Sequence, residues 1–115
     1  MEGLIVRPIF LGGSGSALDF SQAAAAGQRV IVNLRYSWSV DLGGAGTLPL
    51  PGTPEYAQFV SAACATINTS TGVWGWEIGN EMNNPREFPS TGPLTPQSVV
   101  SVYNAIRSCT SGKRL

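Results

Sequence analysis

Acid/base chemistry in this sequence depends on carboxyl groups. The chain of 115 residues contains no histidine and only seven aspartate and glutamate residues. Histidine is the usual general base, a common metal ligand and the usual partner of a catalytic serine or cysteine, so proton transfer is left to the carboxyl groups. We therefore expect neither a metal ion nor another cofactor. The carboxylates are Glu2, Asp19, Asp41, Glu55, Glu77, Glu81 and Glu87.

The segment best suited to chemistry is 76–83, which reads WEIGNEMN. Apolar and polar residues alternate from Val73 to about Glu81, which is typical of a strand whose two faces differ. In parallel β/α folds the loops at the carboxyl ends of the strands build the active site. A carboxyl group sheltered there can keep its proton near neutral pH and donate it. The pattern indicates Glu81 as a general acid, with a solvated loop or helix-capping carboxylate as the alternative.

Asn80-Glu81, closing an apolar strand that contains Trp76-Glu77, resembles the Asn-Glu signature of the clan A glycoside hydrolases, retaining glycosidases with a β/α barrel. The loop from Asn83 to Pro89 also resembles the polar, aromatic-tipped loops of some of these families. The resemblance implies an O-glycosyl hydrolase of a β-linked polysaccharide, of the cellulose or xylan type, with Glu81 as general acid/base. It also implies that Asn80 binds the sugar hydroxyl next to the reacting carbon, a turn-forming role being the alternative.

Secretion is expected from this resemblance alone. The start of the chain, from Met1 to Pro8, has neither a basic leader nor a cleavable apolar segment, so we expect no signal peptide in this chain.

Further substrate contacts are expected beside Glu81. Tyr36 and Trp38 follow the preceding predicted strand, where their rings could stack on sugars; burial against a helix is the alternative. Asn83, in the loop after Glu81, is a further candidate for binding the substrate. A non-catalytic carbohydrate-binding fragment, in which these residues hold sugar without cleaving it, is the competing hypothesis.

Glu77 lies on the same face of its strand as Glu81 but deeper, so it needs a polar partner. We expect a structural pair with Arg35, or a bond to Asn33, on the neighbouring strand. By the same alternation Trp74 and Trp76 point to the other face, and we expect both in the core.

Glycoside hydrolysis uses two carboxylates. The resemblance implies a nucleophile on the seventh strand of a barrel, and this chain contains no counterpart. The sequence could be a fragment, a second copy could complete the site, or a local residue could stand in. Asp41 and Glu87 could approach Glu81, and we favour Asp41 as the base of an inverting reaction.

The element pattern indicates an α/β fold. Residues 1–115 are interpreted as a single domain with about three β/α units and a parallel sheet, because a full eightfold barrel needs about 250 residues. The resemblance implies an incomplete TIM-type barrel covering roughly strands two to four. Open sheet edges would favour homo-oligomers. We predict strands at 4–11, 29–36 and 73–81, a helix at 19–26 capped by Asp19, and helices that begin after Thr53 and Thr95. The buried stripe of the last helix is expected to consist of Val99, Val100, Tyr103 and Ile106.

Composition excludes several classes of partner. The formal net charge is zero and no basic run occurs, so a nucleic acid is not expected. No apolar stretch approaches the roughly 18 residues needed to span a bilayer, so a membrane is not expected either. The expected partner is a polysaccharide or oligosaccharide. Cys64 and Cys109 are interpreted as two small buried apolar residues, with a disulfide between neighbouring helices as the alternative.

Overall fold

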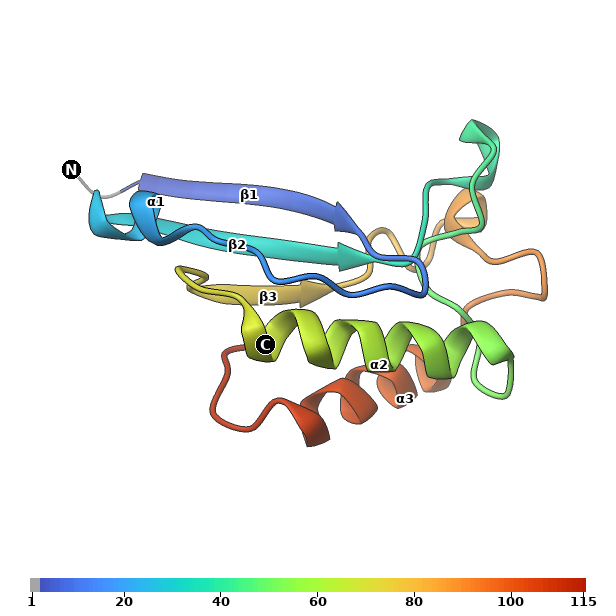
Figure 1. The fold of residues 1–115 in the computed structure, drawn as a ribbon. Helices are drawn as coiled ribbons and strands as arrows, with labels where there is room; N and C mark the ends of the chain where they lie inside the picture. Colours follow the sequence, from blue (N-terminus) through green and yellow to red (C-terminus); the bar gives the residue numbers. More distant parts are fainter. Residues whose placement is uncertain (1–2) are drawn as a thin grey trace.

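The structure, a computed structural model, describes residues 3–115. Met1 and Glu2, which belong to the start interpreted as lacking a leader, lie outside the described residues. Three parallel strands in the order β1-β2-β3 alternate with three helices, so the predicted α/β alternation is confirmed. The described strands form an open sheet (Figure 1). The elements are β1 (Gly3–Phe10), α1 (Ser21–Ala25), β2 (Gln28–Arg35), α2 (Pro54–Thr69), β3 (Gly75–Ile78) and α3 (Pro96–Cys109), with 3-10 turns η1 (Val40–Leu42) and η2 (Pro85–Glu87).

The core lies between the sheet and the pair α2 and α3, which cover the same face of the sheet (Figure 1). Val30, Val32 and Leu34 alternate along β2 toward these helices and have no exposed area. Phe59 of α2, also fully buried, belongs to the same cluster. Pro8 lies in β1, at the edge of the sheet, as expected of a residue that cannot donate to a ladder.

The predicted starts of the two long helices are confirmed. The Thr53 side chain accepts a hydrogen bond from the Tyr56 N–H, and Pro54 takes the first position of α2. Thr95 caps α3 in the same way and forms a capping box with Ser98. These caps satisfy backbone N–H groups that a helix leaves unpaired at its start.

The prediction that Asp19 is the N-cap of α1 is wrong, because the helix begins at Ser21 and its N-cap is Phe20. Asp19 instead accepts a hydrogen bond from the Ser21 N–H at 2.9 Å, outside the helix. The predicted strand to about Glu81 is also too long. β3 ends at Ile78, since Gly79 adopts a φ of 79° that turns the chain.

Two core predictions need correction. Trp76 is buried, but Trp74 precedes β3 and is 40% exposed, with the Arg114 guanidinium 3.9 Å from its ring centroid. On α3, Ser98, Val102 and Ile106 are buried, whereas Val100, predicted in the buried stripe, is 55% exposed. Both errors arise because the sequence pattern gives periodicity but not which side of an element meets a neighbour.

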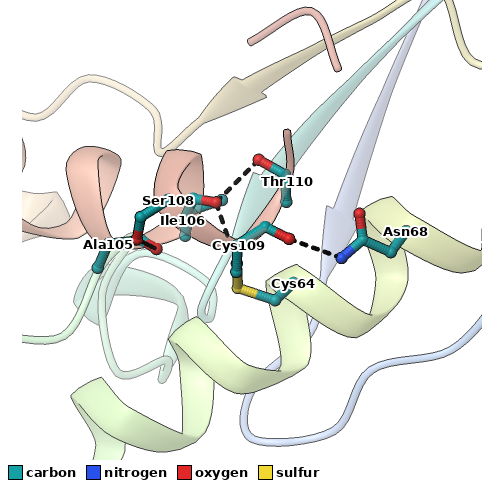
Figure 2. Close-up of a disulfide and its surroundings, with 7 residues drawn as sticks. All are labelled: Cys64, Asn68, Ala105, Ile106, Ser108, Cys109 and Thr110. Carbon is teal, nitrogen blue, oxygen red and sulfur yellow. Dashed lines mark hydrogen bonds between the residues drawn. A yellow bond between two sulfur atoms is a disulfide. The ribbon is translucent and has the colours of Figure 1, made fainter. Parts of the chain in front are cut away.

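A disulfide joins Cys64 of α2 to Cys109 at the end of α3 (Figure 2), so the interpretation as two free buried residues is wrong and its alternative is right. The two Cα atoms lie 6.0 Å apart, within the span that a disulfide bridges. Beside it, the Asn68 side-chain amide donates a hydrogen bond to the Cys109 carbonyl at 2.8 Å. The two helices are thus fixed to each other near the same end.

The outer edge of β3 is partly paired by the end of the chain. The Trp76 N–H donates to the Arg114 carbonyl at 2.9 Å, and the Tyr103 hydroxyl donates to the Leu115 carbonyl at 3.4 Å. Self-association through open edges stays a prediction. Within residues 3–115, no helix has the length and apolar character to cross a bilayer.

Candidate functional site

The candidate site lies at the carboxyl ends of the strands, where the loops 36–53 and 79–95 both begin (Figure 1). Thr47, which has no exposed area, holds the two loops together. Its N–H donates to the Glu87 carbonyl at 2.9 Å, its carbonyl accepts from the Tyr36 N–H, and its hydroxyl oxygen accepts from the Asn80 N–H at 2.8 Å. One buried threonine therefore fixes the backbone on either side of Glu81. Nothing in the sequence pattern distinguished this residue.

Glu81 presents an exposed side chain just beyond the end of β3. Its φ of 45° makes it the one non-glycine residue with a positive φ in the described range 3–115. Such a conformation is unfavourable for a residue with a Cβ, and residues of this kind cluster at functional sites. Asn84 stabilises it, because the Asn84 side-chain amide donates to Glu81 Oε2 at 3.2 Å and the Asn84 N–H donates to the Glu81 carbonyl at 2.8 Å.

Asn33 connects the polar side chains of β2 and β3. It is buried, and its amide donates to Glu77 Oε2 at 3.1 Å and to the Gly79 carbonyl at 2.8 Å. Its Oδ1 accepts from Arg35 Nε at 2.6 Å. The expected pair of Glu77 and Arg35 is thus joined through Asn33 rather than by a direct ion pair. Glu77 is also exposed, not buried, because no element covers this face of β3.

Glu87 ends η2 and is only 8% exposed. Burial raises the pKa of the Glu87 carboxyl; the charge of Arg35 opposes this rise and the charge of Glu81 adds to it. No polar side-chain atom of the described residues is both fully buried and without a hydrogen-bond partner, so the Glu87 carboxylate is not an isolated buried group. From the sequence, Asp41 was favoured over Glu87 as the second carboxylate beside Glu81. The burial of Glu87 could not be predicted, because burial at a short 3-10 turn leaves no pattern in the sequence.

Asp41 is engaged elsewhere. Its carboxylate lies 2.9 Å from Arg86 Nε, and both side chains are exposed. The Ser39 hydroxyl donates to the Arg86 carbonyl at 2.9 Å in the same region. These contacts clamp η1 to η2, so Asp41 is bonded to the segment that carries Glu87 rather than to Glu81 itself.

The aromatic candidates differ from each other. Trp38 is 54% exposed and stacks on Phe10, the last residue of β1, with ring centroids 3.9 Å apart. The Arg35 guanidinium lies 5.5 Å from the Phe10 centroid. Tyr36 is half-buried and packs edge-on against Phe59 at 6.1 Å, which follows the alternative of burial against a helix. The Trp38 ring is therefore exposed and accessible to a ligand, whereas Tyr36 is one of the residues that line a cavity of about 140 Å³.

The two asparagines of the loop after β3 are placed differently. Asn80 is half-buried with its backbone held by Thr47, while Asn83 is exposed. Within residues 3–115, no three histidine, cysteine or carboxylate side chains gather in a way that would hold a metal ion. The site thus combines an exposed strained glutamate, a buried glutamate, an arginine and an open aromatic face.

No protein-family model matches this chain, and no curated protein or solved structure matches it.

Proposed function

We propose that the chain carries the acid/base part of a glycoside hydrolase active site, with Glu81 as the general acid/base. The observation that carries this proposal is the conformation of Glu81: a glutamate held at a φ of 45°, exposed, at the carboxyl end of a parallel strand. A glycine would suit this backbone better, so a glutamate at this position points to a role for its carboxyl group. The proposed substrate is a β-linked polysaccharide of the cellulose or xylan type.

In the proposed reaction the Glu81 proton passes to the glycosidic oxygen as the bond from that oxygen to the anomeric carbon breaks. The electron pair of the broken bond stays on the departing oxygen. A water oxygen bonds to the anomeric carbon, and its proton passes to a base. For the chain acting by itself, Asp41 is the proposed base of an inverting reaction, and its carboxylate is held by an ion pair with Arg86. Within a complete clan A barrel, as the resemblance implies, a nucleophile on the seventh strand would take its place and the reaction would retain configuration.

Sugar binding is proposed at two kinds of side chain. The exposed Trp38 ring, supported from behind by Phe10, offers a flat apolar face of the kind that stacks on a pyranose. Asn80 and Asn83 offer amide groups near Glu81 for hydroxyl groups of the sugar. Bonds of this kind strengthen as positive charge develops on the ring in the transition state.

We further propose that the chain is part of a clan A β/α barrel, matching its second to fourth strands, as the resemblance at Asn80-Glu81 implies. The three-stranded parallel sheet with helices on one face supports this proposal. The disulfide between Cys64 and Cys109 supports secretion, because structural disulfides persist mainly in oxidising compartments.

A non-catalytic carbohydrate-binding role is the second candidate. The stacked pair of Trp38 and Phe10 favours it, since this platform could hold a sugar without any proton transfer. With either proposed function the chain should bind oligosaccharides. The two proposals differ in whether the bound sugar is hydrolysed and whether Glu81 is needed for that step.

The test is the release of reducing sugar from β-glucans, xylans and mannans, together with oligosaccharide binding by calorimetry. We expect Glu81→Gln to lower hydrolysis by at least about 100-fold while binding survives. Asp19→Asn, which changes an exposed carboxylate at the opposite end of the sheet, should leave hydrolysis unchanged. Binding without hydrolysis in the unaltered chain would support the binding role, and neither binding nor hydrolysis would contradict both proposals.

A further inference from the structure

A cavity of about 140 Å³ lies between the loop that follows β2, the start of α2 and the loop that follows β3. Neither Glu81 nor Trp38 lines it, so the function proposed above gives it no role. A cavity of about 150 Å³ takes up one benzene molecule, so this cavity is sized for one six-membered ring rather than for several linked rings. Its lining includes Tyr36, Pro49, Glu55, Pro89, Ser90 and Thr91.

The wall of the cavity is held by backbone contacts between and within the two loops. Gly46 allows the loops to approach closely, because a Cβ at this position would lie only 2.8 Å from the Pro89 nitrogen of the other loop. The Gly92 N–H donates a hydrogen bond to the Pro89 carbonyl at 3.1 Å and closes the turn 89–92. The cavity is therefore shaped by backbone that is bonded and packed, as a binding site requires.

The polar groups of the lining come from both loops and from the start of α2. Glu55 lies in the first turn of α2, and its carboxylate, when ionised, accepts hydrogen bonds and donates none. The hydroxyl groups of Tyr36, Ser90 and Thr91 can donate as well as accept. The Tyr36 ring is held in place by its edge-on packing against Phe59. A ligand that carries several hydroxyl groups can therefore find both donors and acceptors here.

The charge and the apolar part of the lining narrow the class of ligand further. Among the described residues that line the cavity, none is lysine or arginine and Glu55 is the one carboxylate, so an anion would be repelled. Ala45, Pro49 and Pro89 place apolar surface beside the polar groups. A pyranose has apolar C–H faces and a rim of hydroxyl groups, and it therefore matches both parts of the lining.

We propose that this cavity is a further subsite that binds one sugar unit of the β-linked polysaccharide, an inference that rests on the function proposed above. The Glu55 carboxylate accepts hydrogen bonds from sugar hydroxyl groups, and the hydroxyl groups of Ser90 and Thr91 bond to the remaining sugar oxygens. The Tyr36 ring packs against the C–H groups of the sugar. The subsite adds affinity for the glycan and takes no part in proton transfer.

NMR of the nitrogen-15-labelled full chain, titrated with cellotriose and with xylotriose, tests the subsite. We expect the backbone amide signals of Ser90 and Thr91 to shift as one of the sugars binds, and Glu55→Ala to weaken this binding at least about 10-fold. Asp19→Asn, the matched control at the opposite end of the sheet, should leave the binding unchanged. The proposal is overturned if these amides stay unmoved while the exposed Trp38 indole signal saturates, or if Glu55→Ala binds as tightly as the unaltered chain.

A second variant covers the case in which Glu55→Ala does not fold. Thr91→Val removes one exposed hydroxyl group with little change of shape, so we expect binding about threefold weaker or more, and equal affinity would overturn the proposal. Tighter binding of propylammonium than of either sugar at the same amides would overturn the assignment to a sugar. Shifts at the cavity without release of reducing sugar would contradict hydrolysis alone, whereas hydrolysis without such shifts would overturn the subsite alone.

Discussion

The two faces of the sheet are built from the same strands but differ in the side chains they carry and in what covers them. On the face that α2 and α3 cover, Val30, Val32 and Leu34 have no exposed area. On the opposite face β2 carries Ile31 and then the polar residues Asn33 and Arg35, and no helix covers them (Figure 1). The covered face supplies the burial that stabilises the fold, whereas polar groups gather on the uncovered face near the carboxyl ends.

The uncovered face changes along the strands. Near the amino ends, β1 exposes Leu4 and Val6, which are 64% and 52% accessible. Near the carboxyl ends, Asn33 joins Arg35 and Glu77, and the candidate site begins there. The polar side chains of the candidate site are therefore concentrated where hydrophobic burial contributes least, so most changes to them should cost little stability.

Removal of the disulfide should have the largest effect. The bond closes 45 residues between Cys64 and Cys109, and its loss should lower the free energy of unfolding by about 4 kcal/mol from loop entropy alone. Urea denaturation of Cys64→Ser/Cys109→Ser against the oxidised chain measures this. Asn68→Ala, which removes only the hydrogen bond beside the disulfide, is the control and should cost about 1 kcal/mol. Equal stability of the two variants would contradict the assignment of this effect to the cross-link.

Neighbouring side chains of β2 allow the two faces to be compared directly. Leu34→Ala, on the covered face, should lower the free energy of unfolding by about 2–5 kcal/mol, because it leaves a cavity under α2 and α3. Ile31→Ala, on the uncovered face, should cost about 1 kcal/mol because Ile31 is only half-buried. Denaturant titrations of both variants are the measurement. Comparable losses would mean that another surface covers the second face in solution.

Relief of the backbone strain at Glu81 should raise the free energy of unfolding. Glu81→Gly fits the φ of 45°, so we expect it to raise the free energy of unfolding by about 1 kcal/mol while removing the proposed acid. Glu77→Gly is the matched control: it lies inside β3, where glycine should lower stability by about 0.5–1 kcal/mol. A loss of stability in Glu81→Gly would show that the glutamate is retained for structural reasons.

Local signals in the sequence predicted the elements well, since caps and alternation depend on neighbouring residues. Thr53 and Thr95 start helices as predicted, and β2 (Gln28–Arg35) lies within one residue of the predicted range 29–36. Contacts between distant segments could not be predicted in the same way. The pairing of Cys64 with Cys109 depends on how α2 packs on α3, and the burial of Glu87 depends on where the loop 79–95 meets Thr47.

The sequence predicted which residues belong to the candidate site, but not the hydrogen bonds that join them. Asn80 and Glu81 were singled out because they follow a strand, and the structure places them at its carboxyl end. Asn33 was predicted as one of two alternative partners of Glu77, but its bond to Arg35 was not predicted, because alternation places side chains on a face without fixing their distances.

The smallest expected effect lies at the amino end of the sheet, farthest from the site. Hydrogen bonds from Ser21 and Thr71 lower the pKa of Asp19 below its ordinary value of 3.8. A carboxylate whose pKa is depressed by folding stabilises the fold above that ordinary value, and the contribution disappears as the pH falls through the folded pKa. We therefore expect Asp19→Asn to lower the stability slightly and by the same amount at all pH values above about 3.8, pH 7 included, and to flatten the stability profile below that pH, measured by thermal unfolding. Because this carboxylate is exposed, a large change at neutral pH would show that the amino end carries more of the stability than its hydrogen bonds indicate.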